Sequence, residues 1–250
     1  MDWAPRFTGE MLLCGLLGKL LYAPPEKDWI LSLATEGVFD DSPFAAEQPD
    51  VIHGLELLRS WSQGYDAVLR DQAFDELRVD YVRLFVGMGR VLAPPYESVY
   101  FDEERTVFQE RTLQVRAWYR RFGLEVVAGS GEPDDHIGLE LGFLAQLAKL
   151  SLRALAEQNT ENLECLLRNQ HAFLSEHLLK WAPLWCALVD QHARTSFYRG
   201  VAWLVQGALT ELGATMDPDV RHVESELVVR PEALQRSAWA MRSDDDSSGA

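Results

Sequence analysis

The chain has 250 residues, of which 47% are hydrophobic, and a formal net charge of −16. This composition supplies enough apolar side chains for a sizeable core and argues against gross disorder. The acidic balance argues against binding nucleic acid through its phosphates, because such binding requires a basic face. The charge either steers basic partners toward the protein or serves only to keep it in solution.

The cysteines and the apolar runs indicate in which cellular compartment the protein is expected. Three cysteines, Cys14, Cys165 and Cys186, are too few and of odd number for a disulfide framework, and none are spaced as Cys-x-x-Cys. Free thiols favour a reducing compartment, so we expect a cytoplasmic protein. The best apolar run, residues 11–21, is interrupted by Lys19 and is shorter than the ~20 residues that a membrane span needs. We interpret it as part of a buried first helix rather than a signal peptide.

The hydrophobic pattern is helical along nearly the whole chain. Leucines recur at three and four residues between positions 12 and 21, which is one face of a helix, and Pro24-Pro25 ends that element. Similar patterns predict helices over residues 26–34, 49–69, 74–86, 105 or 112 to 122, 133–157, 160–183 and 195–213. Pro183 is expected to break or kink the helix that begins at residue 160, and glycines and prolines exclude a helix from residues 87–103.

This pattern predicts an all-α protein of about nine or ten helices packed as one domain. No run of alternating apolar and polar residues is long enough to predict a strand with conviction. We place the globular domain at residues 1–213 and a C-terminal extension with one short helix at residues 214–242. The acidic and serine-rich residues 243–250 are expected to be disordered.

One polar cluster precedes the long helix near the middle of the chain: Glu132-Pro133-Asp134-Asp135-His136, with Glu140 one turn later. His136 and Glu140 are four residues apart and therefore share a helix face. The side chains admit three roles: they cap the helix start, they bind a metal, or they line a groove that holds a partner. A metal site is short of ligands, because no other histidine has paired ligand spacing. We therefore predict no bound metal and no cofactor.

A second unusual segment lies upstream. Tyr81, Leu84 and Phe85 fall at helical spacing, which for any one of them is typical of plain core packing. The following Ala93-Pro94-Pro95-Tyr96 is a rigid, extended and aromatic segment of a kind that often contacts peptides. Exposure of Tyr96 or Tyr100 would favour peptide contact, and burial would favour core packing.

Recognisable catalytic motifs are missing from the sequence. It contains no Gly-x-Ser-x-Gly elbow, no phosphate-binding loop and no Gly-x-Gly-x-x-Gly fingerprint. The remaining enzymatic alternative is a metal-dependent hydrolase that uses Asp134, Asp135, His136 and Glu140.

In the order and amino-acid sequence of these segments, the chain resembles the TorD/DmsD family of cytoplasmic chaperones for molybdenum-containing oxidoreductases. The resemblance rests on four pieces of sequence: residues 81–87, 93–100, 116–123 and 132–141. It covers residues 77–150 closely and the flanking helices more loosely. It implies an all-helical chaperone, not an enzyme, that binds the twin-arginine leader of a partner oxidoreductase before export and guards the precursor until its molybdopterin cofactor is inserted.

The resemblance also implies where the leader binds. Carried over to this chain, the leader-binding positions are Tyr81, Leu84, Phe85, Pro95, Pro133, Asp135 and His136. From the residues themselves we add Tyr96 and Glu140 to the predicted leader-binding site. Relatives have tryptophan where this chain has Tyr81, so aromatic character is kept. The expected partners are the leader and the precursor, with transient contact at the export machinery of the membrane. The physical reading agrees, because a leader that is basic at one end and apolar in the middle complements an acidic and aromatic groove.

Overall fold

The computed structural model describes residues 2–65, 70–87, 91–101, 110–126 and 131–215. Within these ranges the chain forms ten α-helices and no strand, so the predicted all-α fold is confirmed. None of the helices in the described ranges combines the length and hydropathy needed to cross a bilayer.

The first helix, α1 (Trp3–Tyr22), packs along α7 (Ile137–Ala156). Its buried leucines are spaced as one helical face requires: Leu13, Leu17, Leu20 and Leu21. The two backbones nearly touch at Gly18 and Gly138, where a Cβ atom on either residue would lie 2.8 Å from the other's carbonyl oxygen. Only glycine fits at this contact, which fixes the start of α7 against the end of α1.

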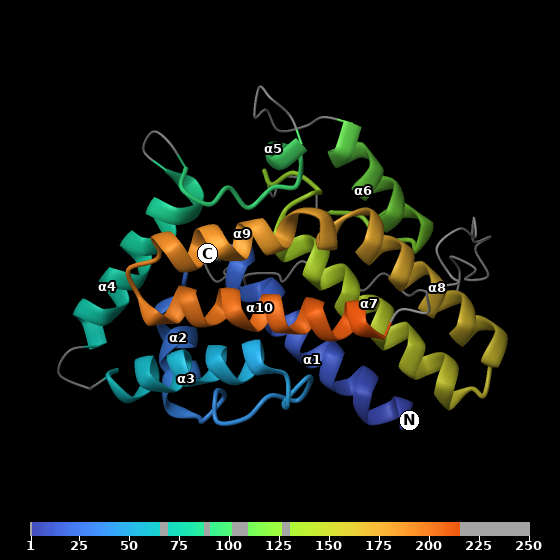
Figure 1. Cartoon of the computed structure of the whole chain (residues 1–250), viewed down its shortest axis with the longest axis horizontal. Coiled ribbons are helices and arrows are strands. Elements are labelled where there is room, and N and C mark those ends of the chain that lie inside the picture. The colour runs from blue at the N-terminus through green and yellow to red at the C-terminus, as the bar shows by residue number, and fades with distance from the viewer. Residues whose placement is uncertain (1, 66–69, 88–90, 102–109, 127–130, 216–250) are drawn as a thin grey trace, which may run out of the picture.

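A second glycine contact joins α3 (Pro49–Gln63) to α10 (Ser196–Ala214). A Cβ atom on Gly54 or on Gly200 would again lie 2.8 Å from the other's carbonyl oxygen. Helix α9 (Leu178–His192) packs beside α10, and the two lie next to each other across the front of the molecule in Figure 1. The two glycine contacts therefore join the N-terminal helices α1 and α3 to helices from the second half of the chain.

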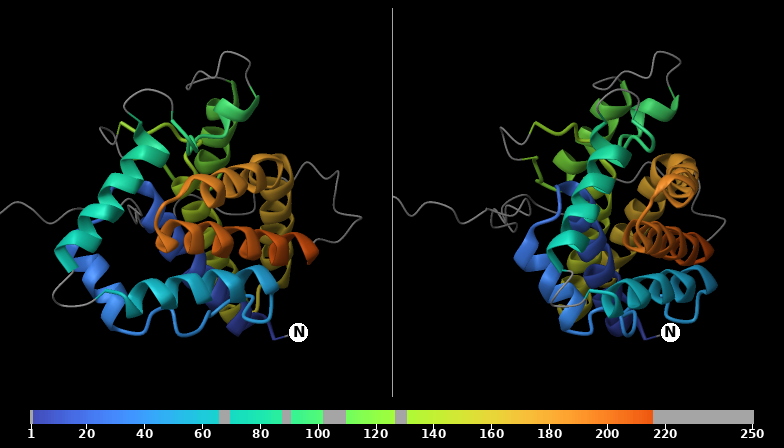
Figure 2. Two further views of the ribbon diagram at one scale, coloured as in Figure 1. Left: turned by 60° about the vertical axis from the view of Figure 1, so that its left-hand side comes forward. Right: turned by 90° about the vertical axis from the view of Figure 1, so that its left-hand side faces the viewer.

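The remaining elements are α2 (Lys27–Thr35), α4 (Arg70–Tyr81), the π-helical turn η1 (Val82–Val86), α5 (Ser98–Phe101), α6 (Glu110–Arg121) and α8 (Thr160–Glu176). Figure 2 shows α5 and α6 at one end of the molecule, opposite α3 and the start of α1. The turn η1 continues α4 and ends at Gly87, whose N–H donates to the Val82 carbonyl oxygen at 2.6 Å. Such π-helical turns are frequent at functional sites.

Several helix ends differ from the sequence-based expectation. The long helix begins at Ile137 rather than at Pro133, because residues 132–136 pair with another loop instead. The chain breaks at His177, not at Pro183, which is accommodated inside α9. Residues 98–101 form the single turn α5 within a segment predicted to be non-helical. The first helix also begins earlier than its apolar pattern, at Trp3.

The C-terminal part of the chain is described as far as Thr215, one residue beyond the end of α10. The predicted short helix of the extension and the predicted disordered tail lie outside the described residues. The boundaries between the domain, the extension and the tail therefore stay predictions.

Candidate functional site

Two loop segments, residues 94–98 and 132–137, run antiparallel and pair through their backbones; we call this pair the seam. Two hydrogen bonds join them: the Glu97 N–H donates to the Asp135 carbonyl oxygen at 3.0 Å, and the Ile137 N–H donates to the Pro95 carbonyl oxygen at 2.8 Å. Together they make Tyr96 and His136 an antiparallel bridge. The structure thus brings together the two segments that the sequence singled out.

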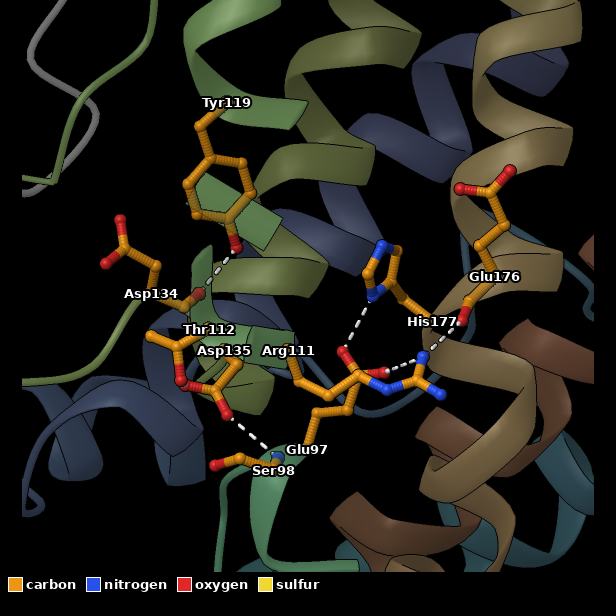
Figure 3. Close-up of polar contacts among 9 residues, drawn as sticks. All are labelled: Glu97, Ser98, Arg111, Thr112, Tyr119, Asp134, Asp135, Glu176 and His177. Atoms are coloured by element: carbon orange, nitrogen blue, oxygen red, sulfur yellow. Dashed lines mark hydrogen bonds and ion pairs between the residues drawn. The ribbon is translucent and has the colours of Figure 1, made fainter. Parts of the chain in front are cut away.

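Asp135 lies at the centre of the seam and has no exposed surface. One carboxylate oxygen accepts the Ser98 N–H at 2.8 Å, and the other accepts the Thr112 hydroxyl at 2.9 Å. Figure 3 shows these contacts converging from the start of α5 and from α6. Asp135 therefore ties three pieces of chain together, and its carboxylate is directed into the protein.

His136 is the N-cap residue of α7. Its Nδ1 accepts the Gly138 N–H at 3.0 Å, which leaves the ring proton on Nε2. The rings of Tyr22 and Tyr96 meet it edge-on, with centroids 5.7 and 5.3 Å away. Burial lowers the pKa of His136 to about 3, so the ring is neutral at physiological pH. The capping role considered from the sequence is thus filled by His136 itself.

Asp134 faces the opposite way from Asp135. One of its oxygens accepts from Arg116 through Nε at 2.9 Å and Nη2 at 2.7 Å, and its backbone carbonyl oxygen accepts the buried Tyr119 hydroxyl at 2.9 Å. This contact raises the pKa of Arg116. Helix α6 is therefore attached to the seam through three of its residues, Thr112, Arg116 and Tyr119.

Glu97 connects the seam to the junction of α8 and α9. Its fully buried carboxyl lies 2.7 Å from Nδ1 of His177 and 3.4 Å from Nη1 of Arg111. Arg111 also reaches the Glu176 carbonyl oxygen at 3.4 Å, as Figure 3 shows. These contacts lie at His177, the residue at which α8 ends and α9 begins, and the sequence pattern did not reveal this break.

Glu140 is the exception among the carboxyls of the site. It is fully buried, and neither of its oxygens has a hydrogen-bond partner in the part of the chain that the structure describes. Burial raises its pKa well above 4.5, and the neighbouring Glu97 and Asp135 raise it further. The indole of Trp181 lies close enough to favour the ionised form slightly, but its N–H makes no hydrogen bond of normal geometry.

The upstream residues Tyr81, Leu84 and Phe85 are buried, as core packing predicts. Phe85 stacks on Trp185 with centroids 5.9 Å apart, and the Tyr81 hydroxyl donates to the Leu21 carbonyl oxygen at 3.4 Å. Burial and then the charge of Glu132 raise the pKa of Tyr81, which places this tyrosine within electrostatic reach of the seam. The predicted site residues Pro95 and Pro133 are also buried.

The outer edge of the seam is formed by Tyr22, Tyr96 and Glu132, which we call the rim. All three are partly exposed, and the Tyr96 hydroxyl donates to Glu132 at 2.6 Å. Tyr100 is half-buried as well, with its hydroxyl on the Pro94 carbonyl oxygen at 2.9 Å. The tyrosines thus combine structural hydrogen bonds with an exposed edge, so their exposure does not separate core packing from peptide contact.

Two grooves of opposite charge lie on the described surface, and the second of them adjoins the contacts of Glu97 with Arg111 and His177. The first, of about 600 Å³, is lined by Asp71, Gln72, Asp75, Glu76, Val79, Asp80, Arg194 and Thr195. The second, of about 370 Å³, is lined by Arg111, Gln114, Ala117, Trp118, Arg121, Glu176, His177 and Lys180. Within the described ranges, no three His, Cys, Asp or Glu side chains are arranged to hold a metal ion.

Sequence reasoning assigned no role to several residues that build the site. These are Tyr22 on α1, Glu97 and Ser98 beside α5, Arg111, Thr112, Arg116 and Tyr119 on α6, and His177 and Trp181 at the start of α9. They come from four separate parts of the chain, and no local spacing connects them.

Comparison with known proteins identifies relatives of this arrangement. The model of the nitrate reductase delta subunit family matches residues 55–187, just over half of the chain and including both halves of the seam. The chain is 27% identical over 201 residues to the Tat proofreading chaperone DmsD of Salmonella typhi, which covers 80% of this chain and 87% of DmsD.

Two chaperone proteins named TorD are also similar. TorD of Vibrio cholerae is 31% identical over 168 residues, 67% of this chain and 70% of TorD. TorD of Aliivibrio fischeri is 29% identical over 136 residues, 54% of this chain and 62% of TorD. All three of these relatives are named as chaperones, and none of them supports the hydrolase alternative.

Proposed function

Because the chain belongs to the nitrate reductase delta subunit family, together with the TorD and DmsD chaperones, we propose that it is a redox-enzyme maturation chaperone. It binds the twin-arginine leader, the apo form, or both, of a molybdenum-containing oxidoreductase. It has no catalytic activity of its own, and it assists cofactor insertion and proofreading of the precursor before export. Such a role places it in the cytoplasm, with transient contact at the export machinery of the membrane.

The observation that carries this proposal is the seam together with its rim. Tyr22 and Tyr96 offer aromatic edges, and Glu132 offers a partly exposed carboxylate next to them. A leader peptide presents arginines beside an apolar stretch, and this combination complements a carboxylate bordered by aromatic rings. The net charge of −16 attracts such a peptide over a longer range.

The buried members of the predicted site have a supporting role in this proposal. Leu84, Phe85, Pro95, Pro133 and Asp135 are covered in the free protein. They hold the seam and the turn η1 in position, and they become leader contacts only where the seam opens. Rim residues are therefore expected to govern the first encounter with the leader.

Titration calorimetry with a twin-arginine leader peptide from a molybdoenzyme of the same organism tests the proposal. We expect a Kd in the micromolar range or tighter, about −8 kcal/mol or better, and no binding when both arginines are replaced by glutamine. Affinity should fall with added salt because the attraction between opposite charges is screened. Absence of binding to every leader tested would falsify the leader-binding role.

A rim variant and a matched control locate the binding face. We expect Glu132→Gln to weaken leader binding about tenfold, because it removes the carboxylate at the rim. Glu56→Gln, an equal change in charge on the exposed face of α3 at the opposite end of the molecule, should leave affinity unchanged. Equal effects of the two variants would show that only overall charge matters and would remove the rim from the site.

A further inference from the structure

Among the three fully buried carboxyls of the site, Glu140 alone has no hydrogen-bond partner in the described residues. Asp135 accepts two hydrogen bonds, and Glu97 lies between His177 and Arg111. Glu140 is as deeply buried as these two, yet both of its oxygens are unpaired. Buried polar groups without partners are rare in folded proteins, and each one calls for a physical explanation.

Further unpaired polar atoms lie in the same part of the interior. The indole Nε1 atoms of Trp181 and Trp185 and the hydroxyl of Ser98 are buried without a hydrogen bond. Ser98 belongs to the seam, Trp181 lies beside Glu140, and Trp185 stacks on Phe85 in η1. The interior behind the seam is thus polar but incompletely bonded.

Charged and titratable groups surround Glu140 from the seam, from α6 and from α1. The seam contributes Asp135 and Glu97, α6 contributes Tyr119, and His177 and Arg111 reach Glu140 only through their contacts with Glu97. From α1, Tyr22 contacts His136, one turn before Glu140. Among the described residues no cation is bonded to Glu140, so these residues supply no counter-charge to its ionised carboxylate.

We propose that leader binding ionises Glu140: an arginine guanidinium received at the seam supplies the counter-charge that Glu140 lacks, and the Glu140 proton passes to solvent. In this step one carboxyl O–H bond breaks, the electron pair stays on the carboxylate, and the proton is taken up by buffer. The guanidinium suits the role because it presents five donors in a rigid fork to a carboxylate. This inference rests on the proposed function and specifies how the same site recognises its ligand.

The proposed proton release predicts the direction in which leader affinity changes with pH. The leader binds the form of the protein in which Glu140 is ionised, whereas burial holds the free protein in the protonated form. Affinity should therefore increase with pH, by up to about tenfold per pH unit for one proton. A leader that binds only at the rim would show no such dependence from Glu140.

The experiment is titration calorimetry of the full chain with an N-acetylated leader peptide lacking histidine and acidic residues, at pH 6, 7 and 8. Measuring each pH in phosphate and in Tris, whose ionisation enthalpies differ, gives the number of protons released per peptide bound. We expect about one proton at pH 7 and a Kd that decreases as pH increases. The peptide with both arginines replaced by glutamine should release none.

Two glutamate-to-glutamine variants show whether the released proton comes from Glu140. Glu140→Gln keeps the shape but does not ionise, so it should abolish proton release and weaken binding at least tenfold. Glu10→Gln is the control: Glu10 is also buried, with its pKa raised to about 8 by burial, but it lies on α1 bonded to Gln170. It should bind the leader as the wild type does, with the same proton count.

The outcomes distinguish this inference from the proposed function. Binding without proton release, or proton release that persists in Glu140→Gln, would overturn the role of Glu140 and leave the chaperone function intact. Absence of binding by the wild type would overturn both. Thermal unfolding shows whether Glu140→Gln is folded; if it is not, the pH dependence and proton count of the wild type and of Glu10→Gln decide the matter.

Discussion

Two buried polar centres in this protein are built in opposite ways. At the contact between α4 and α10, Asp80 accepts four hydrogen bonds: from Arg83 at 2.8 Å, and from the Arg194 N–H, the Thr195 N–H and the Thr195 hydroxyl at 2.9 Å each. At the seam, Glu140 is equally buried and accepts none. The fold is therefore able to surround a carboxylate with donors, and it does so where the carboxylate's role is to join helices.

The difference between the two centres indicates different roles. A fully bonded centre rigidifies the structure, because its loss leaves several donors unpaired. An incompletely bonded centre costs stability and persists where function needs it. On this view Asp80 supports the fold, while Glu140 is kept available for a ligand. The predictions below test this division.

The largest expected effect is on stability at the Asp80 centre. We expect Asp80→Ala to lower the free energy of unfolding by about 3–5 kcal/mol, because it leaves the backbone N–H groups of Arg194 and Thr195 without an acceptor and the partly buried Arg83 guanidinium without its carboxylate partner. Urea denaturation measures this loss. Leader affinity per folded molecule should stay within about twofold of wild type. A stability loss under about 1 kcal/mol, or a selective loss of leader binding, would contradict the structural role of Asp80.

A smaller effect is expected where α1 sets the position of the seam. In Gly18→Ala, the new Cβ would lie 2.8 Å from the Gly138 carbonyl oxygen, so α7 must shift at its first turn. We expect a destabilisation of about 1–3 kcal/mol together with weaker leader binding, since His136 and Glu140 move with α7.

Gly15→Ala is the matched control on the same helix. Its new Cβ would meet only the Cβ of Ala145, at an ordinary 3.9 Å. Alanine also favours the helix by up to about 1 kcal/mol relative to glycine, so stability should be unchanged or slightly higher. Equal losses in the two variants, measured by urea denaturation and by leader titration, would show that the close backbone contact is not what positions the seam.

The pH dependence of stability provides a third test. The folded-state pKa values of Glu10, about 8, and of Glu140 are raised above the ordinary value of 4.5. The folded protein therefore holds protons that the unfolded chain has already released. Stability from these groups is present below about pH 4.5 and is lost as pH rises toward their folded-state pKa values.

The expected slope is about 1.4 kcal/mol per pH unit for each carboxyl. Urea denaturation between pH 5 and 8 measures it, and Glu10→Gln and Glu140→Gln should each make the curve flatter. The two variants differ in one respect only, because Glu140→Gln should also lose leader binding. A Glu140→Gln curve that coincides with the wild type would show that Glu140 does not hold a proton in the folded state.

The sequence predicted the helical framework because helices carry their signal locally. The leucines of α1 at three- and four-residue spacing, and Pro24-Pro25 after them, are enough to predict that helix and its end. The pairing of residues 94–98 with residues 132–137 had no such signal. It joins segments almost forty residues apart through backbone atoms that every sequence provides.

The roles of the polar residues were hidden for the same reason. Asp135 and Glu140 are both acidic and five residues apart, yet one is fully bonded and the other is unpaired. The difference depends on Thr112 and Ser98, which reach Asp135 from other elements and not Glu140. Sequence therefore identified which segment contains the candidate site, but not which of its carboxyls is available to a ligand.

The smallest expected effect concerns the ion pair between Arg116 on α6 and Asp134 in the seam. Arg116 contacts Asp134 at 2.7 Å but keeps 37% of its side-chain surface exposed to solvent, so water and salt weaken the attraction. A double-mutant cycle with Arg116→Ala and Asp134→Ala should give a coupling energy of about 1 kcal/mol or less, falling further in high salt. The Tyr119 bond survives both changes because it is made to the backbone carbonyl oxygen of residue 134. A coupling energy above about 2 kcal/mol would contradict this expectation and would show that the ion pair supports the fold, as the Asp80 centre does.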